Sequence, residues 1–225
     1  MPNQYNNIVI NIWENLSEAN KSLPGMHLFP MQRPDFIVNP DILFVGMNPS
    51  FSKTLQENDV AAQYLWQANA DRAQIDNLIA LENEAHEDYL TYFGALRRFA
   101  QSANANNFEH LDLLPIRHTN QKEVLAKHWN SNGEPNEIVK QSIDLFKSTV
   151  IEISPKTIVV ANAGAARIII RALQLDSYDE KRKYRWNELE ETPFFLSSML
   201  SGQRALDEFS KDRLIADVRR ALYPN

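Results

Sequence analysis

Cysteine is absent from this chain of 225 residues, which excludes disulfides, cysteine nucleophiles and thiolate metal sites. Long apolar runs are also absent, and none approaches the roughly 20 residues that a membrane-spanning helix needs. The first residues, up to Trp13, contain no basic stretch followed by an apolar core, so we expect no secretory signal. Together these absences predict a cytoplasmic protein that has no contact with a membrane.

Positive charge is scarce as well, because 23 Lys and Arg residues face 29 Asp and Glu residues, for a net charge of −6. Bulk charge therefore gives no support to nucleic-acid binding, which would need a local basic patch. The chain has no P-loop, GxGxxG, HExxH or GxSxG motif. Its five histidines show no metal-ligand spacing, so we expect neither a metal nor a cofactor.

Apolar strands that alternate with helices are the main pattern present. We expect strands at 42–45, 108–116, 157–161 and 194–198. This alternation predicts an α/β fold with a parallel sheet and helices on both faces. No linker or repeat interrupts the pattern, so we expect one domain over residues 1–225, present as a monomer. Helices are expected at 4–23, where the helix packs on the domain, and at 75–103, 121–129, 136–153, 164–173 and 205–222, with a charged connection at 176–183.

Polar loops follow three of these strands, at residues 46–52, 117–120 and 197–204. Ligands of open α/β sheets bind at the carboxyl ends of the strands, so these loops are the predicted site. Three of the residues at these strand ends also have a plainer interpretation. The Asn48-Pro49 pair is a common turn dipeptide, and His118 fits a surface histidine. Asp112, in a strand otherwise rich in leucine, is either an end-of-strand cap or a recognition group, because an unpaired buried charge is costly.

The chain resembles the uracil-DNA glycosylase superfamily in four segments that occur in the expected order. Residues 40–52, PDILFVGMNPSFS, look like its first motif, in the form typical of the mismatch-specific and single-strand-selective branches. Residues 108–116, FEHLDLLPI, resemble the strand whose end reads the flipped base. Residues 154–173 are similar to its proline, apolar strand, small-residue turn and helix. Residues 194–214, FFLSSMLSGQRALDEFSKDRL, lie where its second catalytic motif is expected.

The resemblance implies a three-layer α/β/α sandwich with a four-stranded parallel sheet. It also implies base-excision DNA repair, in which a hydrolase (a glycosidase) cleaves the N-glycosidic bond of a flipped base. The implied partner is DNA, single-stranded or as a damaged duplex. In this alignment Asn48 positions the attacking water. The implied base-binding residues are Gly46, Met47, Ser50, Asp112 and Met199, and the implied DNA-binding residues are Arg117, His118, Ser201 and Gly202.

Two positions depart from the family pattern. The histidine or asparagine of the second motif falls on Met199, whose thioether donates no hydrogen bond. We therefore add Gln203 and Arg204 to Asn48 as catalytic candidates, since both follow in the same loop. The base-reading asparagine falls on Asp112, which suits a base edge with two N–H donors when ionised and mimics an amide when protonated.

Three functions follow from these residues. The first is a DNA glycosylase that acts on a deaminated or modified base. The second is a non-catalytic nucleic-acid or nucleotide-binding module on the same fold. The third, which we rank last, is hydrolysis of a small nucleoside or glycoside that uses Asp112 beside the water on Asn48, because we find no second carboxylate in the loops.

Overall fold

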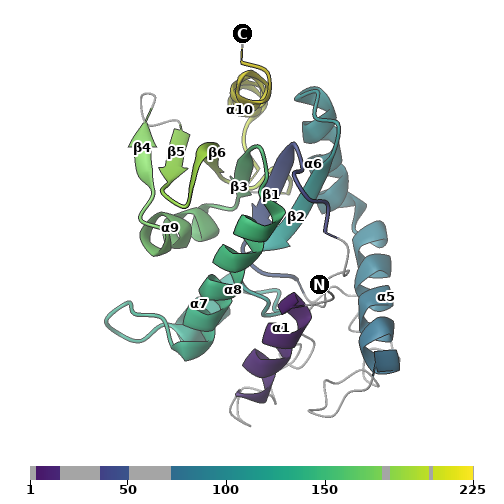
Figure 1. Ribbon diagram of the computed structural model, residues 1–225, viewed down its shortest axis with the longest axis vertical. Coiled ribbons are helices and arrows are strands. Elements are labelled where there is room, and N and C mark those ends of the chain that lie inside the picture. Colours follow the sequence, from purple (N-terminus) through teal and green to yellow (C-terminus); the bar gives the residue numbers. More distant parts are fainter. Residues whose placement is uncertain (1–3, 16–35, 51–71, 179–182, 203–204, 225) are drawn as a thin grey trace. The chain divides into compact units, whose positions relative to one another are not determined.

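The computed structural model describes the chain except for residues 1–3, 16–35, 51–71, 179–182, 203–204 and 225. It is an α/β protein in which helices accompany a six-stranded mixed sheet (Figure 1). The chain divides into two compact units, and each is described by itself. The first takes residues from Met1–Asp35, Asn48–Asp88 and Asp112–Lys147, and the second from Phe36–Met47, Tyr89–Leu111 and Ser148–Asn225.

The sheet belongs to the second unit except for its residue Asp112. Its strand order is β2-β1-β3-β6-β5-β4. The strands are β1 (Ile42–Gly46), β2 (Phe108–Asp112), β3 (Ile158–Ala161), β4 (Asp176–Tyr178), β5 (Lys183–Trp186) and β6 (Leu189–Ser197).

Strands β1, β3 and β6 are parallel, with Phe44 opposite Val159 and Val159 opposite Phe195. All residues of β1 and β3 are buried, as expected of a parallel sheet with both faces covered. The alternate residues Phe44, Val159 and Phe195 form one core cluster with residues of α6 (Leu90–Ser102) and α10 (Glu208–Leu222). Phe44 lies edge-on to Phe99 and Phe108, with ring centroids 5.6 Å away in both pairs.

The expectation of four parallel strands is not confirmed, because β4 and β5 extend the sheet beyond β6 in antiparallel pairs. The charged connection expected at 176–183 contributes β4, and β6 begins at Leu189 rather than at residue 194. The Asn187-Glu188 pair makes the short turn between Trp186 and Leu189, which pair across it. The charged residues are compatible with a strand here because this edge of the sheet faces solvent.

Two further boundaries differ from the sequence pattern. The long helix expected at 75–103 is two helices, α5 (Arg72–Asp88) and α6, which are separated at Tyr89. Gly94, although glycine is a poor helix former, stays inside α6 and is buried. The strand expected at 108–116 ends at Asp112, and the four residues that follow are buried without strand pairing.

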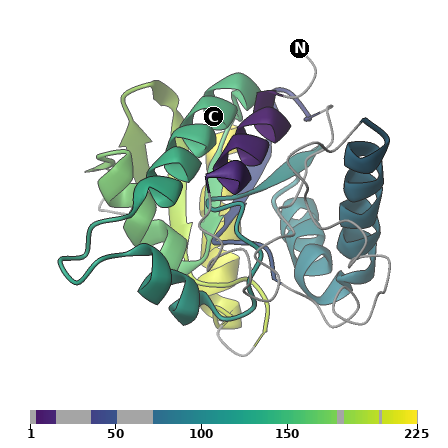
Figure 2. The same ribbon diagram turned by 90° about the horizontal axis from the view of Figure 1, so that it is seen from below.

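The remaining helices lie in the predicted places where the structure describes them. In the first unit these are α1 (Gln4–Glu14), α7 (Gln121–His128) and most of α8 (Glu137–Ile153). In the second unit α9 (Ala163–Ala172) contacts β3 and β6, and α10 contacts β6. Residues 16–23 of the expected N-terminal helix lie outside the described residues. In the part of the chain that is described, no helix has the length and apolar character to cross a bilayer (Figure 2 gives a second view of the helices).

Candidate functional site

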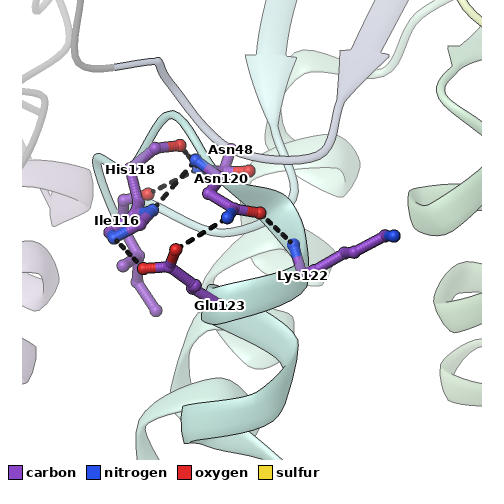
Figure 3. Close-up of polar contacts among 6 residues, drawn as sticks. All are labelled: Asn48, Ile116, His118, Asn120, Lys122 and Glu123. Atoms are coloured by element: carbon purple, nitrogen blue, oxygen red, sulfur yellow. Dashed lines mark hydrogen bonds and ion pairs between the residues drawn. The ribbon is translucent and has the colours of Figure 1, made fainter.

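The Asn48 side chain is held by carbonyl groups from a segment almost seventy residues away in sequence. Its Nδ2 donates to the Ile116 oxygen at 3.0 Å and to the His118 oxygen at 2.7 Å (Figure 3). A third acceptor, the Pro49 oxygen, lies at 3.1 Å. Since an amide has only two N–H donors, three acceptors saturate its nitrogen. The contacts also fix which way the amide faces, because only the nitrogen can point at three carbonyl oxygens.

The other end of the Asn48 amide is different. Its Oδ1 is buried and accepts no hydrogen bond from the described residues. Leaving a buried acceptor unsatisfied typically costs about 1–3 kcal/mol, so it is seldom found without a reason. A small donor such as water would satisfy this oxygen. The fixed amide therefore presents one unused acceptor in a defined direction.

Residues 48–50 and 116–118 are joined by two more contacts. The backbone N–H of His118 donates to the Pro49 oxygen at 2.9 Å, and Arg117 Nη1 donates to the Ser50 oxygen at 2.6 Å. Arg117 is only 3% exposed. Its guanidinium therefore braces the loop that carries Asn48. The DNA contact predicted for Arg117 stays a prediction, and it would require this side chain to become accessible.

His118 is oriented by the start of α7. Its Nδ1 accepts from the backbone N–H of Asn120 at 3.0 Å, so a neutral ring carries its proton on Nε2. That Nε2 lies 3.5 Å from Glu123 Oε2 (Figure 3). Asn120 caps α7 by accepting from the Lys122 N–H and donates through its Nδ2 to Glu123 Oε1 at 2.7 Å. The His118 side chain is thus part of an ordered polar network, and the His118 carbonyl oxygen accepts from Asn48.

Sequence reasoning missed Asn120 and Glu123 as members of this network. The signal was present, because a capping residue followed three positions later by Glu is the pattern of a capping box. In this chain the glutamate contacts the side chains of the cap and of His118. Farther along α7, burial lowers the pKa of His128, and the neighbouring Lys127 and His118 lower it further.

Among the predicted site residues, the structure connects Asn48, Ser50, Arg117 and His118 in the first unit by hydrogen bonds. Asp112 belongs to the same unit and is half-buried at the end of β2. Its role in reading a base stays a prediction. Gly46 ends β1 in the second unit, and Met47 follows it. Met47 is buried, and its sulfur lies near Gly164 in the first turn of α9.

The remaining predicted residues lie in the second unit after β6. The carbonyl of Met199 accepts from the Leu206 N–H at 2.9 Å, and that of Gly202 accepts from the Ala205 N–H at 3.1 Å. Leu200 is buried in the core cluster, where it anchors the loop. Met199 and Ser201 are half-buried, and Gly202 is exposed with a φ of 80°, which suits glycine. Gln203 and Arg204 lie outside the described residues.

Within the described ranges, no group of three or more His, Asp or Glu side chains is arranged to hold a metal ion. The connected residues offer polar positioning through the Asn48 amide. Comparison with known proteins adds no identity, because no family model matches the chain and no curated protein matches it.

Proposed function

We propose that the protein is a divergent DNA glycosylase of the uracil-DNA glycosylase superfamily, which removes a deaminated or modified base from DNA. The observation that carries the proposal is the Asn48 amide, whose nitrogen is saturated by carbonyls while its buried oxygen accepts no hydrogen bond from the described residues. That oxygen is what a hydrolase needs in order to orient a water molecule. The proposal is also supported by the parallel strands β1, β3 and β6, which lie inside the larger mixed sheet and are compatible with the parallel sheet of the superfamily.

The proposed reaction uses no covalent enzyme intermediate. A water molecule that donates to Asn48 Oδ1 attacks the sugar C1′ of a flipped nucleotide. The C1′–O bond forms as the C1′–N bond breaks, and the base leaves as an anion that later takes up a proton. The water's own proton passes to solvent, because an amide orients water but is not a general base.

Base choice and leaving-group stabilisation fall to other residues. Asp112 reads the base edge. Gln203 or Arg204 donates to the leaving base, since the Met199 thioether donates no hydrogen bond. Ser201 and Gly202 contact the DNA backbone. The protein acts as a cytoplasmic monomer on single-stranded or damaged duplex DNA.

Oligonucleotides that contain uracil, hypoxanthine, xanthine or a thymine mismatch test the proposal, each offered single-stranded and as a duplex. Base release is read as strand cleavage at the abasic site after alkali treatment. Asn48→Ala should slow release by about a hundredfold, the usual loss for one positioned polar contact in a site. Asn187→Ala, at the exposed turn between β5 and β6, is the matched control and should leave the rate unchanged. Absence of cleavage of all four substrates by the unaltered protein at high concentration would overturn the proposal.

A second candidate is a nucleic-acid or nucleotide-binding module without catalysis. Met199 favours it, because the position that stabilises the departing base in the superfamily holds no donor here. The net charge of −6 also suits a weak binder. This candidate predicts salt-dependent binding of single-stranded or damaged duplex DNA without base release. Failure to bind either DNA even in low salt would exclude both candidates.

A further inference from the structure

A cavity of about 590 Å³ lies in the second unit, between α9 and α10 and over the end of β6. Its volume is in the range of sites that bind small molecules. All the residues that line it belong to this unit and to the described part of the chain. Ser197 and Ser198 belong to the predicted loop 197–204, but no lining residue was given an individual role from the sequence.

The cavity carries two guanidinium groups from different helices. Arg167 comes from α9 and Arg213 from α10, and both are exposed residues. Among the described residues, no carboxylate pairs with either. The Arg213 guanidinium carbon lies 4.9 Å from the centroid of the Phe209 ring, which limits its positions.

The single carboxylate of the cavity wall does not cancel this charge. Asp217 is buried at 7% exposure and forms an ion pair with Arg220, one turn farther along α10. Its charge is therefore already compensated. The cavity as a whole is positive, which favours an anionic ligand.

The rest of the lining has an apolar part and a hydroxyl part. Tyr184, Leu196 and Ile170 supply apolar surface, and Ser197 and Ser198 follow at the carboxyl end of β6. The Ser197 hydroxyl already donates to the Ser198 carbonyl at 2.9 Å. The Ser198 hydroxyl makes no hydrogen bond within the described residues. A ligand that satisfies these groups needs an anionic end and a flat, mainly apolar end.

We propose that this cavity binds a phosphorylated ring compound of the size of a nucleoside monophosphate. The phosphoryl group is held by Arg167 and Arg213, and the ring lies against Tyr184 and Leu196. Phosphoryl is favoured over carboxylate because two guanidinium groups offer more donors than two carboxylate oxygens use, whereas a phosphate monoester presents three charged oxygens. The proposal does not depend on glycosylase activity.

Calorimetric titration of the full chain with adenosine 5′-monophosphate, adenosine and inorganic phosphate tests this assignment. The nucleotide should bind and adenosine should not, with inorganic phosphate weaker than the nucleotide because it lacks the ring. Arg167→Ala and Arg213→Ala should each weaken nucleotide binding by about tenfold or more, as for the loss of a charge-assisted hydrogen bond. Arg171→Ala, an exposed arginine of the same helix that does not line the cavity, is the matched control.

A free nucleotide and the end of a nucleic-acid strand share this chemistry, so a second arm distinguishes them. It compares a short oligonucleotide with a 5′-phosphate and the same oligonucleotide with a 5′-hydroxyl. Preference for the phosphorylated strand that is lost in Arg167→Ala supports the site and identifies a strand end as its source. Thermal melting confirms that each variant is folded. If no probe binds at millimolar concentration, or if Arg171→Ala weakens binding as much as the cavity variants, the proposal is wrong.

Discussion

Replacing Asn48 by aspartate tests the amide orientation directly. The substitution keeps the shape of the side chain but exchanges an N–H₂ group for an oxygen. In the structure that group faces the Ile116 and His118 oxygens at 3.0 and 2.7 Å. An ionised carboxylate would direct negative charge at both carbonyls and would donate to neither. We therefore expect Asn48→Asp to destabilise the protein.

The size of the effect follows from two terms. Each of the two hydrogen bonds that the amide N–H₂ group donates is worth about 1 kcal/mol, and both are lost. Repulsion raises the folded-state pKa of the new carboxyl above its unfolded value, and each unit of that rise costs about 1.4 kcal/mol at a pH above both values. The expected total is about 3 kcal/mol or more at pH 8. The second term is absent well below pH 4, where the carboxyl is protonated in both states. It grows as the pH rises from the unfolded-state pKa of about 3.9 to the raised folded-state pKa, and it is complete above that value.

Urea unfolding followed by tryptophan fluorescence measures the loss in the free energy of unfolding, since the chain has four tryptophans. Unaltered protein, Asn48→Asp and Asn48→Ala are compared at pH 5, 6.5 and 8. Asn48→Ala removes the same donors without adding charge, and it also removes the unsatisfied Oδ1, so its deficit should be about 1 kcal/mol and independent of pH. If Asn48→Asp is as stable as the unaltered protein at pH 8, the amide is not oriented as described.

Three further predictions concern groups outside this loop. His128 has a lowered pKa, so its neutral form is favoured in the folded state, and stability should fall as the pH drops below about 6.5; His128→Gln should remove that slope in urea titrations. Burial opposes ionisation of Asp41, but hydrogen bonds from Lys156 and Asn106 lower its pKa below the usual aspartate value of 3.8. The advantage of the unaltered protein over Asp41→Asn should therefore be lost as the pH falls through that lowered pKa, in the same urea titrations. Asn162→Ala removes the cap of α9 and should lower the melting temperature through a loss of about 1 kcal/mol; an unchanged melting temperature would contradict the capping role.

The parts of the fold that could be predicted are those whose signal is local. The buried runs at 42–45 and 157–161 and the helix at 164–173 follow from apolar patterning and agree with the structure to within a residue or so. The antiparallel strands at 176–178 and 183–186 were missed because their residues are largely charged or polar and β6, with which β5 pairs, lies farther along the chain. The break at Tyr89 has no glycine or proline to mark it.

The candidate site divides in the same way. Asn48 was singled out because its loop follows a buried strand, which the sequence shows. Its amide orientation was not predictable, since it depends on carbonyl groups at residues 116 and 118, which the fold brings to it. Arg117 was expected to face DNA, but its burial against the Ser50 carbonyl comes from a tertiary contact that carries no mark in the local pattern.

The short strand β4 has a consequence for self-association. With β5 it occupies the edge that β6 would otherwise present, and it is only three residues long. Its partner strand carries Arg185, whose guanidinium carbon lies 4.4 Å from the centroid of the Tyr178 ring, at the end of β4. A short edge strand with charged neighbours gives another molecule few backbone groups to pair with. If β6 were the edge strand, its longer backbone and the apolar pair Phe194 and Phe195 would favour pairing with another molecule. The hairpin thus covers the edge of β6 that would otherwise be open to pairing with a strand of another molecule.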